Sequence, residues 1–564
     1  MDGANGRLSP LAARILAARG LASEGEAARF LSPRLTEMHE PALMPGLERA
    51  AERILHALVT GERVVLYGDY DVDGVTSTAI LHQTARLCAP DADIATYVPH
   101  RIDEGYGLSG EAIARLADEG ADVIVSVDCG VTAIEPAAIA RARGVDLIIT
   151  DHHNPPADGA LPEAFAIVHP RLVGSAYPFG ALAGAGVAFK LAWRLLTMRA
   201  GSEKLSEAWR THLMDMLALC ALGTVADVVP LVDENRAIAR YGLARLKSLP
   251  NVGMRALIEA SGLGGENISS EEVGFRLGPR LNACGRLGHA AEAVELLLTE
   301  DPSRAQEIAR MLCSLNDERR AREREMTELA LEMADAAGMS SAARRAVVLA
   351  HADWHPGVIG IVCSRVVDRL HRPTILLQDQ GEVCKGSCRS VDGFAITDAL
   401  HACAAHLETF GGHDMAAGVS LRRSSLEAFV EAFTEFANAR IGEDDLSPTL
   451  RIDCEAQMRE CSTPAAEQIE QMAPFGRNNP RPVVLLRNTM LARDADPLGS
   501  GGRHIAMHVG DGGAALRVVG WNWGERRDLL RRGQRLDVVI EPKINAWRGR
   551  VSVEGVLRDL RMKG

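Results

Sequence analysis

Gly68-Asp69-Tyr70-Asp71-Val72-Asp73-Gly74 is the stretch around which the rest of this 564-residue chain is organised. It follows an apolar run, Val64-Val65-Leu66-Tyr67, and precedes a helical pattern that extends to Leu87. Three carboxylates therefore alternate over five residues at a strand-to-helix turn, where alternate side chains share one face. A divalent cation would stabilise this charge, because hard cations favour carboxylate oxygens. Taken alone, the stretch is also compatible with an acidic surface turn.

Strand and helix patterns alternate over residues 46–235. The expected strands are residues 64–67, 94–98, 123–127, 147–150 and 166–169. Short apolar strands separated by helices predict an α/β domain with a parallel sheet that is covered on both faces. Ligands of such sheets bind at the carboxyl ends of the strands. We therefore expect the functional site at that edge.

Aspartates and histidines do follow these strands. Asp128 follows the third strand, Asp151-His152-His153 follows the fourth, and Asp227 comes after a helical run at residues 214–222. Four such clusters, one with a histidine pair, are more than helix capping requires. Carboxylate and imidazole ligands without thiolate favour manganese or magnesium over structural zinc. Two cations that share a carboxylate are typical of phosphoryl transfer, and the lack of a GxxxxGK[ST] motif favours hydrolysis.

Composition restricts the class of protein. The chain is 47% hydrophobic and 24% charged, as in globular proteins, and its length suggests about three or four domains. We find no apolar run of membrane-spanning length and no secretory signal order at the N-terminus. The eleven scattered cysteines are typical of reduced cytosolic thiols. A net charge of −13 argues against nucleic-acid binding over the whole surface but allows a local basic groove.

The remaining segments predict four further parts. Residues 1–45 predict a helical arm with two amphipathic helices separated at Gly20, and residues 236–340 a helical connector with a charge-rich helix at 303–337. Residues 341–440 predict a second α/β domain. Residues 448–564 predict an OB-fold β-barrel, with short antiparallel strands at 482–486, 503–508, 516–521, 536–540 and 551–556.

Several polar and aromatic residues are candidates for substrate binding. The chain from Gly501 on has 13 Arg or Lys against 7 Asp or Glu, a local charge of +6, and half of the six tryptophans. Bases stack on exposed rings whatever the sequence, although these tryptophans also suit a barrel core. Arginines bind phosphate in a bidentate manner, and glycines let backbone amides approach it, although the 278–288 segment also suits a turn between helices. The candidates are Arg280, Asn282 and Arg286 in "GPRLNACGRLG", then His355, Ser387, Arg389, the turn Gly411-Gly412-His413, Trp521 and Trp547.

Four segments, in order, carry a family resemblance. "GDYDVDG" at 68–74, "SVDCG" at 126–130, "TDHHNPP" at 150–156 and "GTVADVVPL" at 223–231 resemble the four motifs of the DHH phosphoesterase superfamily. Further pieces, among them "GYGLS" at 105–109, "GAGVAFKL" at 184–191, "KGSCRS" at 385–390 and "FGGHDMAAG" at 410–418, narrow the resemblance to the RecJ single-strand-specific exonucleases over nearly the whole chain. The second α/β domain then resembles the DHH-associated domain.

The resemblance implies a metal-dependent exonuclease that degrades single-stranded DNA from 5′ to 3′ into 5′-mononucleotides, in recombination and repair. It implies Asp128 as a bridging ligand and His153 as a contact of the scissile phosphate or the leaving group, whereas Asp69 and Asp151 are either ligands or supporting residues. It also implies a single-strand-binding protein and a helicase as partners. We expect a cytoplasmic monomer that ends at Gly564, about where the barrel should end. The implied metal ligands are Asp71, Asp73, Asp128, His152 and Asp227.

Two alternatives stay open at this point. The first is a DHH-type phosphoesterase that acts on short oligonucleotides or cyclic dinucleotides, which the basic, tryptophan-rich C-terminal part disfavours. The second is a catalytically weak relative that only binds single strands, which the complete set of acidic and histidine residues disfavours.

Overall fold

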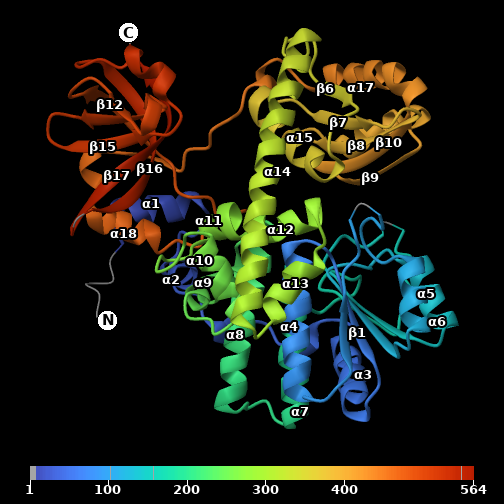
Figure 1. The fold of residues 1–564 in the computed structure, drawn as a ribbon. Helices are drawn as coiled ribbons and strands as arrows, with labels where there is room; N and C mark the ends of the chain where they lie inside the picture. The colour runs from blue at the N-terminus through green and yellow to red at the C-terminus, as the bar shows by residue number, and fades with distance from the viewer. Residues whose placement is uncertain (1–7, 102, 157, 548, 564) are drawn as a thin grey trace. The chain divides into compact units, whose positions relative to one another are not determined.

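A computed structural model describes residues 8–101, 103–156, 158–547 and 549–563. Contacts divide the chain into two compact units (Figure 1). One unit consists of Glu40–Asp227 and Gly242–Thr449, and the other combines the described part of Met1–His39 with Val228–Tyr241 and Leu450–Gly564. The larger unit holds the clusters predicted from the sequence.

The first sheet of the larger unit is parallel throughout. Its order is β2-β1-β3-β4-β5, so β1 and β3 lie inside the sheet. The five predicted strands are confirmed within two residues at each end, and the α/β fold class is confirmed. The strands are β1 (Val64–Gly68), β2 (Ile94–Tyr97), β3 (Val123–Val127), β4 (Asp146–Thr150) and β5 (Ala166–Val168).

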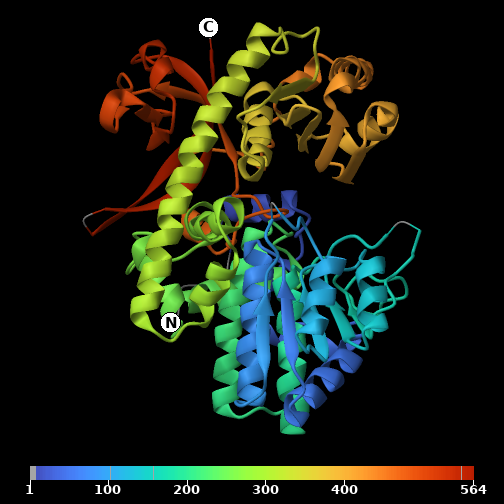
Figure 2. The same cartoon turned by 45° about the vertical axis from the view of Figure 1, so that its right-hand side comes forward.

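Helices cover both faces of this sheet (Figure 2). α5 (Gly110–Asp118) and α6 (Ile134–Ala142) pack on one face, where Ile113 and Ala137 meet Ile124 and Ile149. α4, which directly follows β1, is buried almost all round and packs against α7 and α8. The helices on this side are α3 (Leu47–Thr60), α4 (Val72–Cys88), α7 (Gly184–Ala200) and α8 (Glu207–Ala226).

Helical segments connect this domain to the second one. The predicted charge-rich helix is α14 (Pro302–Ala336), capped by Asp301. It packs on α10 and α12 at one end and on α15 and β6 at the other. Halfway along, the buried Glu323 carboxylate accepts hydrogen bonds from Arg319 and Arg365, each at 2.7 Å. The other connector helices are α10 (Val252–Ala260), α11 (Ser270–Glu272), α12 (Gly278–Leu287) and α13 (Ala291–Leu298), whereas α9 (Asp233–Leu246) belongs to the smaller unit up to Tyr241.

The second domain has a mixed sheet of order β6-β7-β8-β10-β9, in which only the β6–β7 pair is parallel. α15 (Pro356–Leu370) packs on one face, and α16 (Ile396–Ala402) and α17 (Leu426–Arg440) pack on the other. This arrangement confirms the predicted second α/β domain. Its strands are β6 (Val347–His351), β7 (Thr374–Asp379), β8 (Val383–Arg389), β9 (Thr409–His413) and β10 (Ala416–Arg422).

The smaller unit holds the predicted barrel. Its ring of pairings, β12–β16–β17–β15–β14–β12, closes because β14 also pairs with β12. All five predicted strands are present, but two details differ: β15 and β17 pair in parallel, and the last two strands have 13 residues each. The strands are β11 (Cys454–Ala456), β12 (Val484–Leu491), β13 (Asp496–Leu498), β14 (His504–Gly510), β15 (Ala515–Gly520), β16 (Arg535–Trp547) and β17 (Arg550–Met562).

The two predicted N-terminal helices are α1 (Pro10–Ala18) and α2 (Glu24–Leu31), and they lie on either side of Gly20. Leu11 and Ile15 of α1 enter the barrel core beside α18 (Thr463–Glu470). Arg236 joins the parts of this unit: its buried guanidinium donates to the carbonyls of Phe30 at 2.7 Å and Met472 at 2.8 Å.

We expect Arg236→Met to destabilise the smaller unit by about 3 kcal/mol, because hydrogen bonds from a charged donor stabilise by roughly 1.5–3 kcal/mol and buried carbonyls would lose their partner. Urea unfolding followed by tryptophan fluorescence measures this change. Arg240→Met is the matched control, since its guanidinium donates to the Gln471 carbonyl at 3.2 Å in an exposed position. Equal midpoints for the two variants would contradict this role of Arg236.

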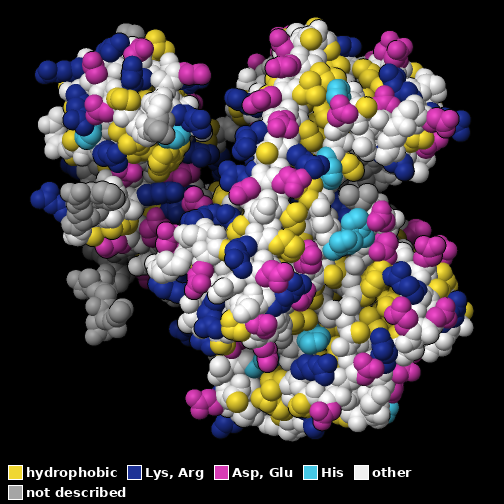
Figure 3. All heavy atoms as spheres, in the orientation of Figure 1, with side chains coloured by type: hydrophobic (Ala, Val, Ile, Leu, Met, Phe, Trp, Pro, Cys, Tyr) yellow, Lys and Arg dark blue, Asp and Glu magenta, His cyan; other side chains and the backbone are white. Residues whose placement is uncertain are grey.

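No helix among the described residues is long and apolar enough to cross a membrane. On the face drawn in Figure 3, acidic and basic side chains are interspersed. On this face the negative net charge is therefore mixed with basic side chains, which leaves room for a local basic path.

Candidate metal centre

The first acidic cluster lies where β1 ends and α4 begins. Asp71 caps α4, because its Oδ1 accepts the N–H groups of Asp73 at 2.9 Å and Gly74 at 3.1 Å. Asp73 is buried in the first turn, and its two carboxylate oxygens accept the N–H groups of Gly184 at 2.6 Å and Ala185 at 2.8 Å. The N-terminus of α7 thus stabilises the Asp73 carboxylate.

Asp128 lies at the end of β3 with a left-handed backbone, at φ 65°. Asp and Asn adopt this conformation more readily than most residues. The N–H of Asp128 donates to the Thr150 carbonyl at 2.9 Å, which continues the pairing with β4 by one residue. The turn directs a buried carboxylate toward His152, whose Nε2 lies 3.2 Å from Asp128 Oδ1.

Asp151 orients the two histidines that follow it. Its Oδ1 accepts the N–H groups of His152 at 2.7 Å and His153 at 3.1 Å, and it also bonds His153 Nδ1 at 2.8 Å. Its Oδ2 accepts the N–H of Val131 at 2.9 Å. Burial favours the protonated form, but the hydrogen bonds and charge of His153 hold the pKa of Asp151 below its usual range.

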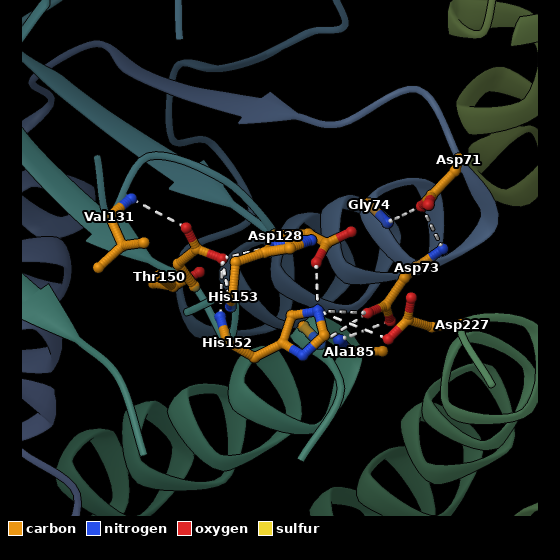
Figure 4. Close-up of polar contacts among 12 residues, drawn as sticks. Asp71, Asp73, Gly74, Asp128, Val131, Thr150, His152, His153, Ala185 and Asp227 are labelled. Carbon is orange, nitrogen blue, oxygen red and sulfur yellow. Dashed lines mark hydrogen bonds and ion pairs between the residues drawn. The ribbon is translucent and has the colours of Figure 1, made fainter. Parts of the chain in front are cut away.

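His152 Nε2 is the point at which the clusters converge (Figure 4). It lies 3.2 Å from Asp128 Oδ1, 3.5 Å from Asp227 Oδ2 and 3.8 Å from Asp73 Oδ2. Asp227 reaches this point from the C-terminal end of α8, which it caps. The sheet edge and a helix end therefore bring together residues 154 positions apart in the sequence, from Asp73 to Asp227.

Three groups of potential ligand atoms result, and within each group the atoms lie no more than 4.8 Å apart. Asp128 belongs to two of them. The groups are Asp73, His152 and Asp227; Asp128, His152 and His153; and Asp69, Asp71 and Asp128.

The buried polar atoms of this cluster fit divalent cations. Asp69 Oδ1, Asp128 Oδ1 and His152 Nε2 are buried and form no hydrogen bond with any described residue. Unpaired buried polar atoms are costly, and hydrogen bonding satisfies most such atoms in native proteins. Oxygen and imidazole donors directed at shared points are suited to manganese or magnesium.

The pKa values of these residues also indicate a cation-binding site. Burial, followed by the charge of Asp71, raises the pKa of Asp73 to about 7. Burial together with the neighbouring aspartates also raises the pKa of Asp69 and Asp128. Burial and the charge of His153 lower the pKa of His152 to about 3, so this imidazole keeps the free lone pair that a metal ligand needs. A cation would stabilise the crowded carboxylates in their charged form.

His153 differs from its neighbour. Burial alone would lower its pKa, but the hydrogen bond to Asp151 and the charges of Asp151, Asp227 and Asp73 raise it to about 9. Its carbonyl bonds His169 Nε2 at 2.7 Å, and the carbonyl of His152 accepts a hydrogen bond from Arg171. The backbone of the histidine pair is thus fixed from outside the cluster.

Two glycines that sequence reasoning missed are needed for this packing. A Cβ at Gly184 would lie 2.5 Å from Asp128 Oδ1, and one at Gly223 would lie 2.6 Å from Asp73 Oδ1. Both distances are shorter than any normal contact. Both residues lie in segments that resemble the family, but a helical glycine carries no chemical signal, so only the structure reveals their role.

Asn282 supports the first cluster. The segment 278–288 also suits a turn between helices, but residues 278–287 form helix α12, with Pro279 in its first turn. Gly285 lets the helix approach closely, because a Cβ there would lie 2.7 Å from the Tyr70 carbonyl. Asn282 Oδ1 then accepts the N–H of Val72 at 3.0 Å, between the two aspartates of α4.

We expect Asn282→Ala to weaken Mn²⁺ binding about tenfold, because residues that orient ligands typically contribute 10–100-fold to metal affinity or activity. Electron paramagnetic resonance titration of Mn²⁺ measures this effect. Asn438→Ala is the matched control, since Asn438 Oδ1 accepts the Arg345 N–H at 2.9 Å in the second domain. Unchanged Mn²⁺ affinity in Asn282→Ala would rule out this supporting role.

The arginines of α12 point in different directions. Arg280 donates to the Arg276 carbonyl at 2.6 Å and to Cys313 Sγ at 3.3 Å, away from the cluster.

Arg286 lines a cavity of about 130 Å³ with Ala226, Asn282 and Arg319. Burial and the charges of Arg101 and Arg319 lower the pKa of Arg286 to about 9, and Arg319 Nε has no hydrogen-bond partner among the described residues. Two arginines facing one small cavity suit a phosphate group.

The candidates of the second domain lie on β8, β9 and α15. Ser387 and Arg389 lie on the same face of β8, and a Cβ at Gly360 of α15 would meet Arg389 Nη2 at 3.2 Å and Ser387 Oγ at 3.3 Å. His355 is used differently: its Nδ1 accepts the Gly357 N–H at 3.1 Å and caps α15.

Gly411, Gly412 and His413 lie in strand β9 and not in a turn. His413 Nδ1 lies 3.3 Å from Asn154 Nδ2, next to the histidine pair, so this strand reaches the metal-binding edge. Gly412 has φ 147°, and a Cβ there would lie 2.5 Å from the Ala416 carbonyl, which explains the glycine.

The barrel tryptophans lie in different surroundings. Trp521 is 53% exposed and packs edge-on against His504 at 4.9 Å. Trp523 packs on the barrel core. Trp547 ends β16, and its side chain lies outside the described residues.

A parallel sheet with a carboxylate–imidazole cluster at its carboxyl edge, followed by a second α/β domain and a barrel, defines a metal-dependent phosphoesterase. Family models agree with this class. The DHH family, N-terminal domain, matches residues 63–224, the DHHA1 domain matches 343–439, and the RecJ OB domain matches 452–559.

Individual proteins resemble the chain over nearly its whole length. The single-stranded-DNA-specific exonuclease RecJ of Bacillus subtilis is 38% identical over 98% of this chain and 68% of that protein. The crystal structure of Thermus thermophilus RecJ with Mn²⁺ superimposes with a TM-score of 0.83 at 32% identity, over 99% of this chain and 76% of that one. Its complex with Mg²⁺ gives 0.77 at 30% identity, over 99% and 75%.

The chain belongs to the RecJ family of single-stranded-DNA-specific exonucleases. The predicted fold class, family and exonuclease activity are confirmed, and the two alternatives are not favoured. The prediction of manganese or magnesium is also confirmed, because both ions occur in the related structures and the cluster here fits them.

Proposed function

We propose that this chain removes 5′-mononucleotides from single-stranded DNA in the 5′-to-3′ direction during recombination and repair. The observation that carries the proposal is the convergence of Asp73, Asp128 and Asp227 on His152 Nε2 within 3.8 Å. The names of the related proteins support single-stranded DNA as the substrate.

We further propose roles for the residues of the centre. Two divalent cations held there would lower the pKa of a water molecule, orient it and neutralise charge on the phosphate. Asp128 would be a ligand shared by both cations, and Asp69 would be either a further ligand or a residue that supports the ligands. Asp151 orients His153, whose remaining ring nitrogen would hydrogen-bond the departing oxygen. The proposed metal ligands are Asp71, Asp73, Asp128, His152 and Asp227.

Substrate contacts form the next part of the proposal. Arg286 at its cavity, and Ser387 with Arg389 on one face of β8, would bind phosphates of the strand. The remaining ring edge of His413 and the exposed ring of Trp521 would contact bases or sugars. Arg280 and His355 would act indirectly, because Arg280 donates to the Arg276 carbonyl within its own helical segment and His355 caps α15.

The wider organisation is proposed on the same basis. We propose domain limits of 1–45, 46–235, 236–340, 341–440 and 448–564; the matches at 63–224, 343–439 and 452–559 support the second, fourth and fifth of these. Eleven free cysteines support a reducing compartment, so we place the protein in the cytoplasm, at the nucleoid during repair. A monomer that cooperates with a single-strand-binding protein and a helicase completes the proposal.

One experiment separates this proposal from its alternatives. The purified chain with Mn²⁺ is given a 5′-labelled single strand, the same strand labelled at its 3′ end, a blunt duplex and a dinucleotide. We expect immediate release of labelled mononucleotide from the 5′-labelled strand, gradual shortening of the 3′-labelled one, and loss of both reactions in EDTA. Equal cleavage of duplex and single strand, or turnover of the dinucleotide alone, would contradict the proposal. Tight binding without turnover would instead support the binding-only alternative.

A further inference from the structure

The side chain of Tyr106 lies beside the proposed metal centre and has no part in the proposed mechanism. It lies in the loop between β2 and α5, between two glycines with left-handed backbones, Gly105 at φ 83° and Gly107 at φ 84°. No described atom lies within 4 Å of the Cβ position of either glycine. The residue is 54% exposed although its hydroxyl contacts the centre. A large aromatic side chain on an exposed loop, directed at a metal site, calls for a functional explanation.

The hydroxyl of Tyr106 contacts His153. Its Oη lies 3.1 and 3.2 Å from the two ring nitrogens of His153 and 3.4 Å from the Asp128 carbonyl. Asp151 already bonds His153 Nδ1 at 2.8 Å. The Tyr106 hydroxyl, almost equally far from the two nitrogens, therefore lies against the part of the ring between them and can donate to the carbonyl of Asp128, so the proton on Nε2 stays available to a substrate.

Ring packing also fixes the side chains of Tyr106 and His153. Tyr106 packs edge-on against His153 at 5.6 Å between centroids and against Tyr70 at 6.4 Å. The loop itself is held to the sheet, because the buried hydroxyl of Tyr67 in β1 donates to the Gly107 carbonyl at 3.0 Å. Two tyrosine hydroxyls thus link β1 to the imidazole of His153.

We propose that Tyr106 is a positioning residue, whose hydroxyl holds the His153 ring with Nε2 facing the departing 3′ oxygen of the first nucleotide. This inference rests on the proposed function. In the reaction a bond forms between water and phosphorus, and the bond between phosphorus and the 3′ oxygen breaks. The electron pair leaves with that oxygen, which takes the proton of His153 Nε2. The attacking water loses one proton to solvent, and solvent returns one proton to Nε2.

A change of leaving group tests the proposal. The substrates are two single strands that differ only at the first linkage, one with the normal 3′ oxygen and one with a bridging 3′ sulfur. A thiolate departs without a proton, because its pKa lies far below that of an alcohol. We expect Tyr106→Phe to slow mononucleotide release from the oxygen strand about 30-fold, and to slow release from the sulfur strand less than threefold.

Two further variants complete the experiment. Tyr67→Phe should show the same preference for the sulfur strand to a smaller degree, because it releases the loop and leaves the Tyr106 hydroxyl in place. Tyr241→Phe is the matched control, since it removes a hydroxyl that donates to the Pro33 carbonyl at 2.9 Å, and it should leave both rates unchanged. Turnover of the sulfur strand also shows that Tyr106→Phe is folded and binds metal.

The remaining outcomes overturn the inference. Equal slowing on both strands would show that Tyr106 acts on the metal centre or the fold in general. No slowing on either strand would show that only its exposed ring matters, as a stacking surface. Failure of the unmodified chain to cleave either strand would instead contradict the proposed function itself.

Discussion

Asp128→Asn is expected to reduce mononucleotide release by at least about 10³-fold while single-strand binding changes little. The reason is its position: Asp128 belongs to two of the three ligand groups, and its Oδ1 has no hydrogen-bond partner among the described residues. Metal ions supply several kcal/mol of charge stabilisation in such reactions, and each 1.36 kcal/mol corresponds to a factor of ten in rate. Asparagine tolerates the left-handed backbone at this position, so the change tests the carboxylate and not the turn.

The same strand offers a matched control. Asp122 precedes β3 at the opposite edge of the sheet, where its exposed carboxylate accepts the Arg63 N–H at 2.8 Å. Asp122→Asn should change the rate less than about twofold, as surface substitutions usually have small effects. Rates come from 5′-labelled single strands, and binding comes from fluorescence anisotropy. If the Asp128→Asn protein kept more than a tenth of the original activity, Asp128 could not be an essential metal ligand.

Gly184→Ala should produce the second large effect, a loss of about 100-fold in activity together with weakened Mn²⁺ binding. The added Cβ would lie 2.5 Å from Asp128 Oδ1 and 2.7 Å from its Cγ, so the carboxylate or the start of α7 must move. Displacements of about 1 Å in a reactive site can cost about 10²-fold. Helix propensity alone favours Ala over Gly by roughly 1 kcal/mol, so the prediction opposes the usual effect of this substitution.

Gly25→Ala in α2 provides the comparison, because no described atom lies within 4 Å of its Cβ position. It should keep full activity and raise the thermal midpoint slightly. The measurements are kcat on single strands and paramagnetic resonance titration of Mn²⁺ for both variants. Full activity of Gly184→Ala would mean that the close approach of α7 to Asp128 does not matter for the centre.

Much of this architecture could be predicted from the sequence because its signals are local. The apolar runs of β1, β3 and β4 indicate buried parallel strands, and the aspartates that follow them then meet at one edge of the sheet. The five barrel strands could be located from alternation and turn residues. Position along a strand thus predicted which residues would converge.

Other features depend on contacts between distant segments and could not be predicted in this way. The sequence offers Asp71 and Asp151 alike as possible metal ligands, but only the structure shows that the Asp151 carboxylate bonds the ring of His153. The glycines of α12 also suit a turn between helices, whereas the structure shows a helix in which the nearby Tyr70 carbonyl leaves no room for a side chain at position 285. The parallel pairing of β15 with β17 follows from closure of the barrel, which no local pattern encodes.

The most direct test of the account is an anomalous difference map from crystals of this chain soaked in Mn²⁺. We expect two peaks roughly 3.5–4 Å apart, with Asp128 between them and His152 Nε2 at bonding distance from one. Asp128→Asn crystals treated in the same way should lose at least one peak, while the fold is retained. A single peak, or peaks away from Asp73, Asp128, His152 and Asp227, would contradict the central claim that these residues form one two-cation site.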